Sequence, residues 1–156
     1  MKYWLMKTEP ESFSWEKLKN NNGKTTHWEG VRNYQARNYL KDMKNGDLVF
    51  FYHSVVQPVS IVGIAKIVKE AYPDFTQFES SSKYFDPKST EENIRWFMVD
   101  IKAEKEFASP VTLEELKSVT GLENMVLLKK GSRLSIQPVT KEEWDIILKY
   151  RKRIKI

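Results

Sequence analysis

Short apolar runs alternate along the chain with polar segments that carry turn and capping residues. Runs rich in β-branched and aromatic side chains predict short strands, and they lie at residues 3–6, 48–52, 60–68, 94–101 and 133–137. Gly63, inside the third run, indicates a bulge or a close approach of the backbone. The sequence contains no internal repeat, low-complexity tract or Gly/Ser linker, so we expect a single domain over residues 1–156.

Helix signals lie between these runs. Ser14 can cap one helix, and Asn33 can cap another that extends to about Met43. Thr112 and Thr140 are each followed three residues later by glutamate, which is the spacing of a capping box. Strands and capped helices without regular βαβ alternation predict an α+β fold, in which a mixed or antiparallel sheet forms a small barrel flanked by short helices.

Composition narrows the possible chemistry. The chain is 40% hydrophobic and 13% aromatic, which is enough for a core and for a cavity lined by rings. It has no cysteine and only two histidines, His27 and His53. This excludes a disulfide framework and a thiolate nucleophile, and we expect neither a metal nor a cofactor. The apolar run at the amino terminus is too short for a signal peptide or a membrane span, so we expect a cytoplasmic protein without a membrane partner.

Charge is concentrated at the carboxyl end. Of the 26 lysines and arginines, five lie in the basic tail at 149–156, so residues 1–148 carry 21 cations against 21 acids. A neutral body does not favour indiscriminate binding to a phosphate backbone, so any nucleic-acid role must use a local site, with the tail as a further attraction. Alternatively, the tail is the solvated end of a helix, with cations near its negative pole.

The densest chemical signal is the block at residues 28–38, which contains two arginines, three carboxamides, two rings and a glycine. Arginine and carboxamide side chains form paired hydrogen bonds with phosphates and base edges, and flat rings stack on bases. We interpret the block as the wall of a nucleotide pocket, with candidate residues Trp28, Arg32, Asn33, Tyr34, Gln35 and Arg37. In the alternative interpretation, both arginines form surface ion pairs and Trp28 is a core ring.

Three further groups of polar residues lie at strand ends. Tyr52, His53 and Ser54 end one strand, and adjacent residues on a strand point to opposite faces. Without a Gly-x-Ser-x-Gly turn, a nucleophile pair is not indicated, and hydrogen bonding to a ligand or a neighbouring loop fits better. Lys7 and Glu9 flank a charged turn, where Glu9 can accept from a cytosine amino group or form a salt bridge.

The third group alternates with apolar residues near the carboxyl end. Arg133, Ser135 and Gln137 should share one strand face, which is either a solvent-facing side or one rim of the pocket.

Taken together, these stretches resemble the EVE domain, a PUA-like small barrel related to the YTH domains that recognise methylated adenine in RNA. The matching segments span nearly the whole chain in order: 4–10, 28–38, 46–47, 51–54, 63–65, 72–74, 84–86, Trp96 and 133–139. Thr8 stands where serine is common, and Ile136 where valine is frequent. The resemblance implies a reader of modified bases in DNA or RNA, and it does not imply turnover.

This leads to the hypothesis that one unstacked nucleotide enters a cavity between the block and the strands that carry residues 52–54 and 133–137. Stacking on Trp28 or a tyrosine would supply about 1–3 kcal/mol, which offsets much of the cost of extruding one base. Arg32, Asn33 and Arg37 would position a phosphate or a base edge, with Lys7 adding attraction.

Two other classes of function remain open. One is an enzyme with His53 as general base and Glu9 or Asp86 as its partner. The other is a protein-binding module that uses exposed rings, for which the candidates are Phe75, Phe78, Tyr84 and Phe85. The segment at residues 72–93 has little periodicity and predicts a long loop, which would act as a lid if it borders the pocket.

Overall fold

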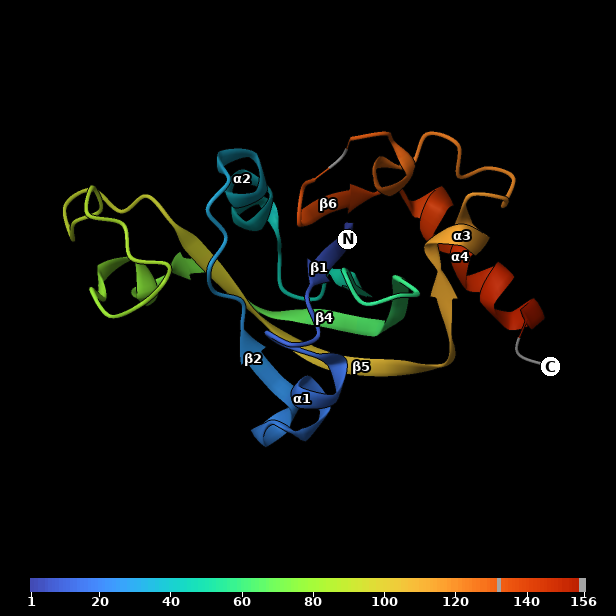
Figure 1. Ribbon diagram of the computed structural model, residues 1–156, viewed down its shortest axis with the longest axis horizontal. Helices are drawn as coiled ribbons and strands as arrows, with labels where there is room; N and C mark the ends of the chain where they lie inside the picture. Colours follow the sequence, from blue (N-terminus) through green and yellow to red (C-terminus); the bar gives the residue numbers. More distant parts are fainter. Residues whose placement is uncertain (132, 155–156) are drawn as a thin grey trace.

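The computed structural model describes residues 1–131 and 133–154. Its six strands form one mixed sheet in the order β2-β5-β4-β3-β1-β6. The long paired strands β4 and β5 are seen in Figure 1. β1 runs parallel to β3, and the other neighbouring pairs are antiparallel. The strand bounds are β1 Tyr3–Thr8, β2 Thr25–His27, β3 Leu48–His53, β4 Ser60–Pro73, β5 Phe97–Thr112 and β6 Ile136–Val139.

The helices begin at the capping residues that the sequence indicates. Ser14 accepts a hydrogen bond from the Lys17 amide, and Asn33 accepts one from the Ala36 amide. Thr112 and Thr140 both form the predicted capping boxes. The α-helices are α1 Trp15–Asn20, α2 Tyr34–Asp42, α3 Leu113–Leu116 and α4 Lys141–Ile154, and the 3-10 turns are η1 Asn22–Lys24, η2 Phe75–Phe78 and η3 Val126–Leu128.

The alternation of side chains along each strand builds a core on both faces of the sheet. In β3, Phe51 joins the core that includes residues of α1 and α2, whereas Phe50 and Tyr52 join the core that includes residues of α3 and α4. In Figure 1, α3 and α4 lie together on one side of the molecule, well away from α2. Helices pack against both faces of the sheet, which confirms the α+β class. No helix within the described residues is long and apolar enough to cross a membrane.

The sheet does not close into the expected barrel. β2 and β6 are its two edges and, over residues 1–131 and 133–154, each has a single strand neighbour. β2 has only three residues and β6 only four, and within the described residues these two edge strands do not pair with each other. The expectation of a closed barrel was therefore wrong, although the α+β class and the mixed sheet are as predicted.

Strand bounds also differ from the pattern. β5 begins at Phe97 rather than Ile94 and extends to Thr112, because it pairs with β4 along nearly its whole length. β6 begins at Ile136, so residues 133–135 precede the strand. β2 was not predicted, since three polar residues give no periodic signal. At Gly63 the ladder shifts register as expected, and an added Cβ would lie 2.7 Å from the Trp15 ring.

A buried carboxylate fixes the strand that leads into the site. Asp47 is 2% exposed, and its oxygens accept from the Lys2 amide, the Trp4 indole N–H and the Lys44 amide, each at 3.0 Å. Burial raises the pKa of Asp47, but these hydrogen bonds outweigh burial and hold the pKa below its usual value. Asp47 thus ties the start of β1 to the turn before β3.

We expect Asp47→Ala to lower the free energy of unfolding by about 3 kcal/mol at pH 7, because three buried donors lose their acceptor. The contribution of a carboxylate with a depressed pKa is fully present above about pH 3.9 and is lost as the pH falls through its folded-state value. Denaturant unfolding of parent and variant across a pH series measures both effects. An equal stability of the two proteins at pH 7 would contradict this role.

Candidate nucleotide-binding site

A cavity of about 610 Å³ lies beside the end of β1. Its volume is within the range of small-ligand pockets, roughly 300–1,000 Å³. Both edges of the sheet contribute to it, β2 directly and β6 through the residue before its start. The lining residues are Lys7, Thr8, Glu9, Ser12, Phe13, Thr26, His27, Trp28, Glu29, Gly30, Val31, Arg32, Lys83, Tyr84 and Ser135.

Backbone hydrogen bonds bring the lining segments together at the end of β1. The Lys7 amide donates to the Ser135 carbonyl at 2.8 Å, which holds the segment before β6 against β1. The Thr8 hydroxyl donates to the Phe13 carbonyl at 2.9 Å and so folds the turn after β1 back onto the strand. The cavity is thus formed where an interior strand ends and its polar residues become accessible.

Trp28 forms part of the cavity wall, but most of its ring belongs to the core. It is 8% exposed and packs edge-on against Phe13 and Phe51, with ring centroids 6.4 and 5.7 Å away. The interpretation of Trp28 as a core ring therefore describes most of its surface. The remaining edge lines the cavity beside Phe13, so the two rings supply its apolar part.

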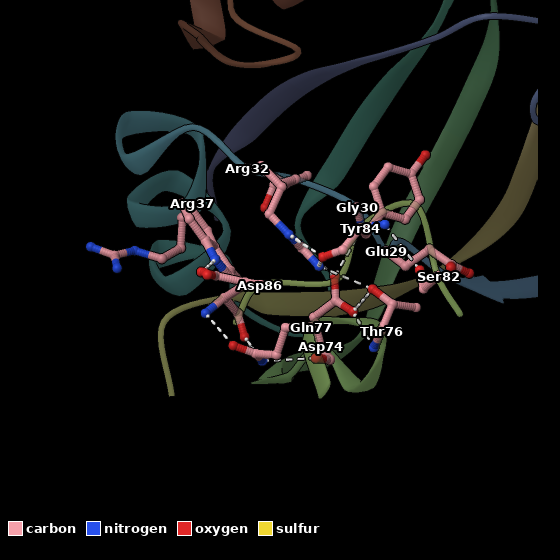
Figure 2. Close-up of polar contacts among 12 residues, drawn as sticks. Glu29, Gly30, Arg32, Arg37, Asp74, Thr76, Gln77, Ser82, Tyr84 and Asp86 are labelled. Carbon is pink, nitrogen blue, oxygen red and sulfur yellow. Dashed lines mark hydrogen bonds and ion pairs between the residues drawn. The ribbon is translucent and has the colours of Figure 1, made fainter. Parts of the chain in front are cut away.

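Arg32 is the centre of a hydrogen-bond network that builds the cavity wall (Figure 2). Its Nε and Nη2 donate to the Tyr84 carbonyl, and Nη2 also donates to the Thr76 hydroxyl. Its Nη1 donates to the Val31 carbonyl and to Asp74 Oδ2, the latter at 3.1 Å. These bonds use all five guanidinium N–H groups. Arg32 therefore acts inside the protein, and it forms neither the surface ion pair of the alternative interpretation nor an open contact for phosphate.

Asp74 is completely buried and accepts hydrogen bonds from two segments. Its carboxylate accepts from Arg32, from the Gly30 amide at 2.8 Å and from both the amide and the hydroxyl of Thr76. Gly30 has a φ of +87°, and a Cβ there would lie 2.5 Å from the Tyr84 ring. The glycine of the block thus allows Tyr84 to cover the backbone at residue 30, as Figure 2 shows.

The segment at residues 72–93 borders the cavity through Lys83 and Tyr84, and its interior is fixed by buried hydrogen bonds. Gln77 donates to the carbonyls of Asp74 and Trp96 and accepts from the Trp96 amide. The same segment presents partly exposed rings at Phe75, Phe78 and Phe85. These hydrogen bonds attach the segment to the chain just before β5, and whether it moves as a lid stays a prediction.

Five of the residues chosen from the sequence line the cavity, namely Lys7, Glu9, Trp28, Arg32 and Ser135. The other candidate residues from the block at 28–38 lie elsewhere. Asn33 is occupied as the cap of α2, and Gln35 donates to the Tyr39 hydroxyl on the exposed side of that helix. Tyr34 stacks on Trp96, and the Arg37 guanidinium lies 4.9 Å from the Tyr34 ring.

The candidates from β3 and β6 also lie outside the lining. Tyr52 is buried in the second core, where burial raises its pKa to about 12, and the Ser54 amide donates to the Thr8 carbonyl. Arg133 is exposed, whereas Gln137 is 1% exposed and donates to the Leu134 carbonyl. The expectation that Arg133, Ser135 and Gln137 share a strand face was wrong, because β6 begins only at Ile136.

His53 has a structural partner. Its Nε2 accepts a hydrogen bond from the Trp15 amide at 3.0 Å, and burial lowers its pKa. Bonding to a neighbouring segment, one of the two roles considered for His53, is therefore what the structure shows. Asp86, its suggested catalytic partner, instead accepts from the Trp96 indole N–H at 2.7 Å. No cluster of three metal-ligating side chains occurs within the described ranges.

The sequence did not indicate several lining residues. Thr26 and His27 come from the unpredicted strand β2, and Lys83 comes from an aperiodic segment in which Tyr84 lies within a matching stretch, residues 84–86. The cavity therefore offers mixed chemistry, because Lys7, Glu9 and Glu29 all line it, and the Lys7 amine lies 5.9 Å from the Tyr52 ring centroid. Burial lowers the pKa of Lys7. Donors, acceptors and ring edges in one polar hollow suit a flat, hydrogen-bonding ligand.

Comparison with known proteins agrees with this architecture. The EVE domain profile matches residues 2–150. Human thymocyte nuclear protein 1 is 50% identical over an aligned region of 163 residues, and this region includes 94% of this chain and 72% of the human protein. The crystal structure of human THYN1 protein in complex with 5-methylcytosine containing DNA has a TM-score of 0.92 at 48% identity, covering 97% of this chain and 98% of that chain. A hypothetical protein from Leishmania major has a TM-score of 0.93 at 43% identity, with 100% and 98% covered.

We expect Arg32→Ala to lower the free energy of unfolding by about 3 kcal/mol, because it leaves the buried Asp74 carboxylate without its cation. Arg37→Ala, a matched loss of a guanidinium from the same block, should cost less than about 1 kcal/mol, since Arg37 is only partly buried. Chemical denaturation measures both. Similar small losses for the two variants would show that the Arg32 network does not hold the wall.

The depressed pKa of His53 makes stability depend on pH. Below about pH 6.5 the unfolded imidazole takes up a proton more readily than the folded one. Stability therefore falls as the pH drops from about 6.5 to the lower folded-state pKa, and His53→Gln, which retains an acceptor, should remove this fall. Unfolding free energies between pH 5 and 8 test the sign, and an unchanged pH dependence in the variant would refute it.

Proposed function

The chain belongs to the EVE domain family, and from this premise we propose that it is a non-catalytic nucleic-acid-binding module that reads one modified nucleotide. The nucleotide leaves its stack and enters the cavity beside the end of β1. The observation that carries the proposal is the cavity itself, which combines Lys7, Glu9 and the edge of Trp28 in one hollow. The human relative that was crystallised with 5-methylcytosine containing DNA supports a modified base in DNA as the target. RNA is the alternative nucleic acid.

The chemistry of the lining suits a pyrimidine of the cytosine type. Glu9 can accept from an exocyclic amino group, and Lys7 can donate to a ring carbonyl or to the attached phosphate. The edges of Trp28 and Phe13 offer apolar surface for an added methyl group. Each matched donor and acceptor counts in such a hollow, because an unpaired buried polar group costs about 1–3 kcal/mol.

Arg32 contributes to this function indirectly. Because its guanidinium is fully engaged with Asp74, Thr76 and Tyr84, it fixes the wall against which the base rests. A wall that is already ordered reduces the conformational entropy that the protein loses when the base binds. Extruding one base costs a few kcal/mol, so a preformed cavity favours recognition by a module that performs no chemistry.

A reading role also agrees with the position of the histidine that would otherwise serve as a base. His53 Nε2 is occupied by the Trp15 amide, and burial lowers the pKa of His53. Asp86 accepts from the Trp96 indole N–H instead. A general base needs a free nitrogen within reach of a substrate proton, so the geometry favours binding over turnover.

The test compares oligonucleotides that carry 5-methylcytosine or cytosine at one central position, using fluorescence anisotropy. We expect the parent to prefer the modified strand and Lys7→Met to lower its affinity about tenfold or more, because a charge-assisted hydrogen bond contributes about 1.5–3 kcal/mol. Lys117→Met removes the same charge at the end of α3, away from the cavity, and should bind as the parent does.

Two results would remove the proposal. One is equal binding of modified and unmodified strands by the parent across cytosine and adenine modifications. The other is identical affinities for the parent and Lys7→Met while both proteins remain folded by circular dichroism.

A further inference from the structure

A stack of rings and guanidiniums leads from the cavity wall to the protein surface. The Arg32 guanidinium carbon lies 5.6 Å from the Tyr84 ring centroid and 5.4 Å from that of Trp96. The Trp96 ring stacks on Tyr34, with centroids 5.0 Å apart and planes at 24°. Arg37 then lies 4.9 Å from the Tyr34 ring. Tyr84 and Arg32 line the cavity, whereas Tyr34 is 50% exposed.

Two chain segments set the composition of this surface. On α2, Tyr34, Arg37 and Lys41 follow a spacing of three and four residues and therefore lie on one helix face. The segment entering β5 supplies Arg95 and the rings beside it, and Lys41 Nζ lies 4.8 Å from the Phe97 ring. We name the group Tyr34, Arg37, Lys41 and Arg95 the α2 stack.

The guanidiniums of the α2 stack are held in place by hydrogen bonds that engage only some of their N–H groups. Arg37 donates one Nη1 bond to the Arg95 carbonyl and donates from Nε and Nη2 to Asn38 Oδ1. Arg95 donates to the Tyr34 hydroxyl and pairs with Asp86 at 3.4 Å. An arginine has five N–H groups, so each guanidinium keeps donors that no described residue engages. A preordered guanidinium loses little entropy when it binds an anion.

We propose that the α2 stack holds the phosphodiester backbone of the nucleic-acid strand next to the nucleotide that enters the cavity. This inference rests on the proposed function and adds to it a second contact on the same strand. Arg32 joins the two places physically, since it lines the cavity and lies beside Trp96. Arginine matches the geometry of phosphate oxygens. Residues 1–148 have no excess of cations, so outside the basic tail the attraction to the backbone must come from a local cluster.

The experiment measures how binding of a 5-methylcytosine oligonucleotide depends on salt. A protein that contacts Z phosphates shows a slope of log K against log salt of about −0.9Z for duplex DNA and −0.7Z for a single strand. Arg37→Gln and Lys41→Gln should each remove one phosphate contact and so reduce the magnitude of the slope by about 0.9 on duplex DNA or about 0.7 on a single strand. The double variant should reduce it by about twice as much. Lys117→Gln removes a cation at the end of α3 as a matched control and should keep the parent slope.

A second readout separates this contact from the cavity. Free 5-methyl-2′-deoxycytidine has no phosphate, so the Gln variants should bind it as the parent does, followed by the NMR shift of the Trp28 indole. If the slopes of Arg37→Gln and Lys41→Gln equal that of the parent while the nucleoside still binds, the α2 stack is not a backbone contact and the cavity function stands. If the parent binds neither the nucleoside nor the oligonucleotide, both proposals fail. Lys41 is exposed, so its variant keeps the test decisive if Arg37→Gln is unstable.

Discussion

The ion pair between Arg32 and Asp74 is the interaction on which the cavity depends. Asp74 has no solvent exposure, so its charge must be compensated inside the protein. Arg32 supplies that charge and, with the donors left over, holds the Tyr84 carbonyl and the Thr76 hydroxyl. Gly30 completes the arrangement by donating its amide to Asp74. One buried pair thus joins the turn before α2 to the segment after β4, and the wall of the cavity follows from it.

The open sheet leaves the end of β1 accessible as the other side of the cavity. Because β2 and β6 are short edges rather than neighbours, the end of β1 remains accessible, and Lys7 and Glu9 line the same cavity as Trp28 and Phe13. Two apolar cores, one on each face of the sheet, pack against the strands that lead to this end. The result is a preformed polar hollow, and a relative with the same fold has been crystallised with DNA that contains a modified cytosine.

Local chemistry made part of this architecture predictable. The caps at Ser14 and Asn33 act within three residues, and the alternation in β3 places Phe50 and Phe51 on opposite faces. Caps and strand faces can therefore be predicted from residues that are neighbours in the sequence. The partner of Arg32 lies 42 residues away, a distance over which spacing carries no information. Rotation along α2 also sends Tyr34 and Arg37 away from the cavity, which composition alone could not reveal.

The central claim is that one nucleotide leaves its stack and occupies the hollow beside β1. A crystal structure of this protein with a short oligonucleotide that carries a single 5-methylcytosine tests it most directly. The account predicts that the modified base lies within hydrogen-bond distance of Lys7 or Glu9 and touches the edge of Trp28, with Arg32 still bound to Asp74. A strand whose modified base stays stacked in the helix, with the cavity filled only by water, would contradict it.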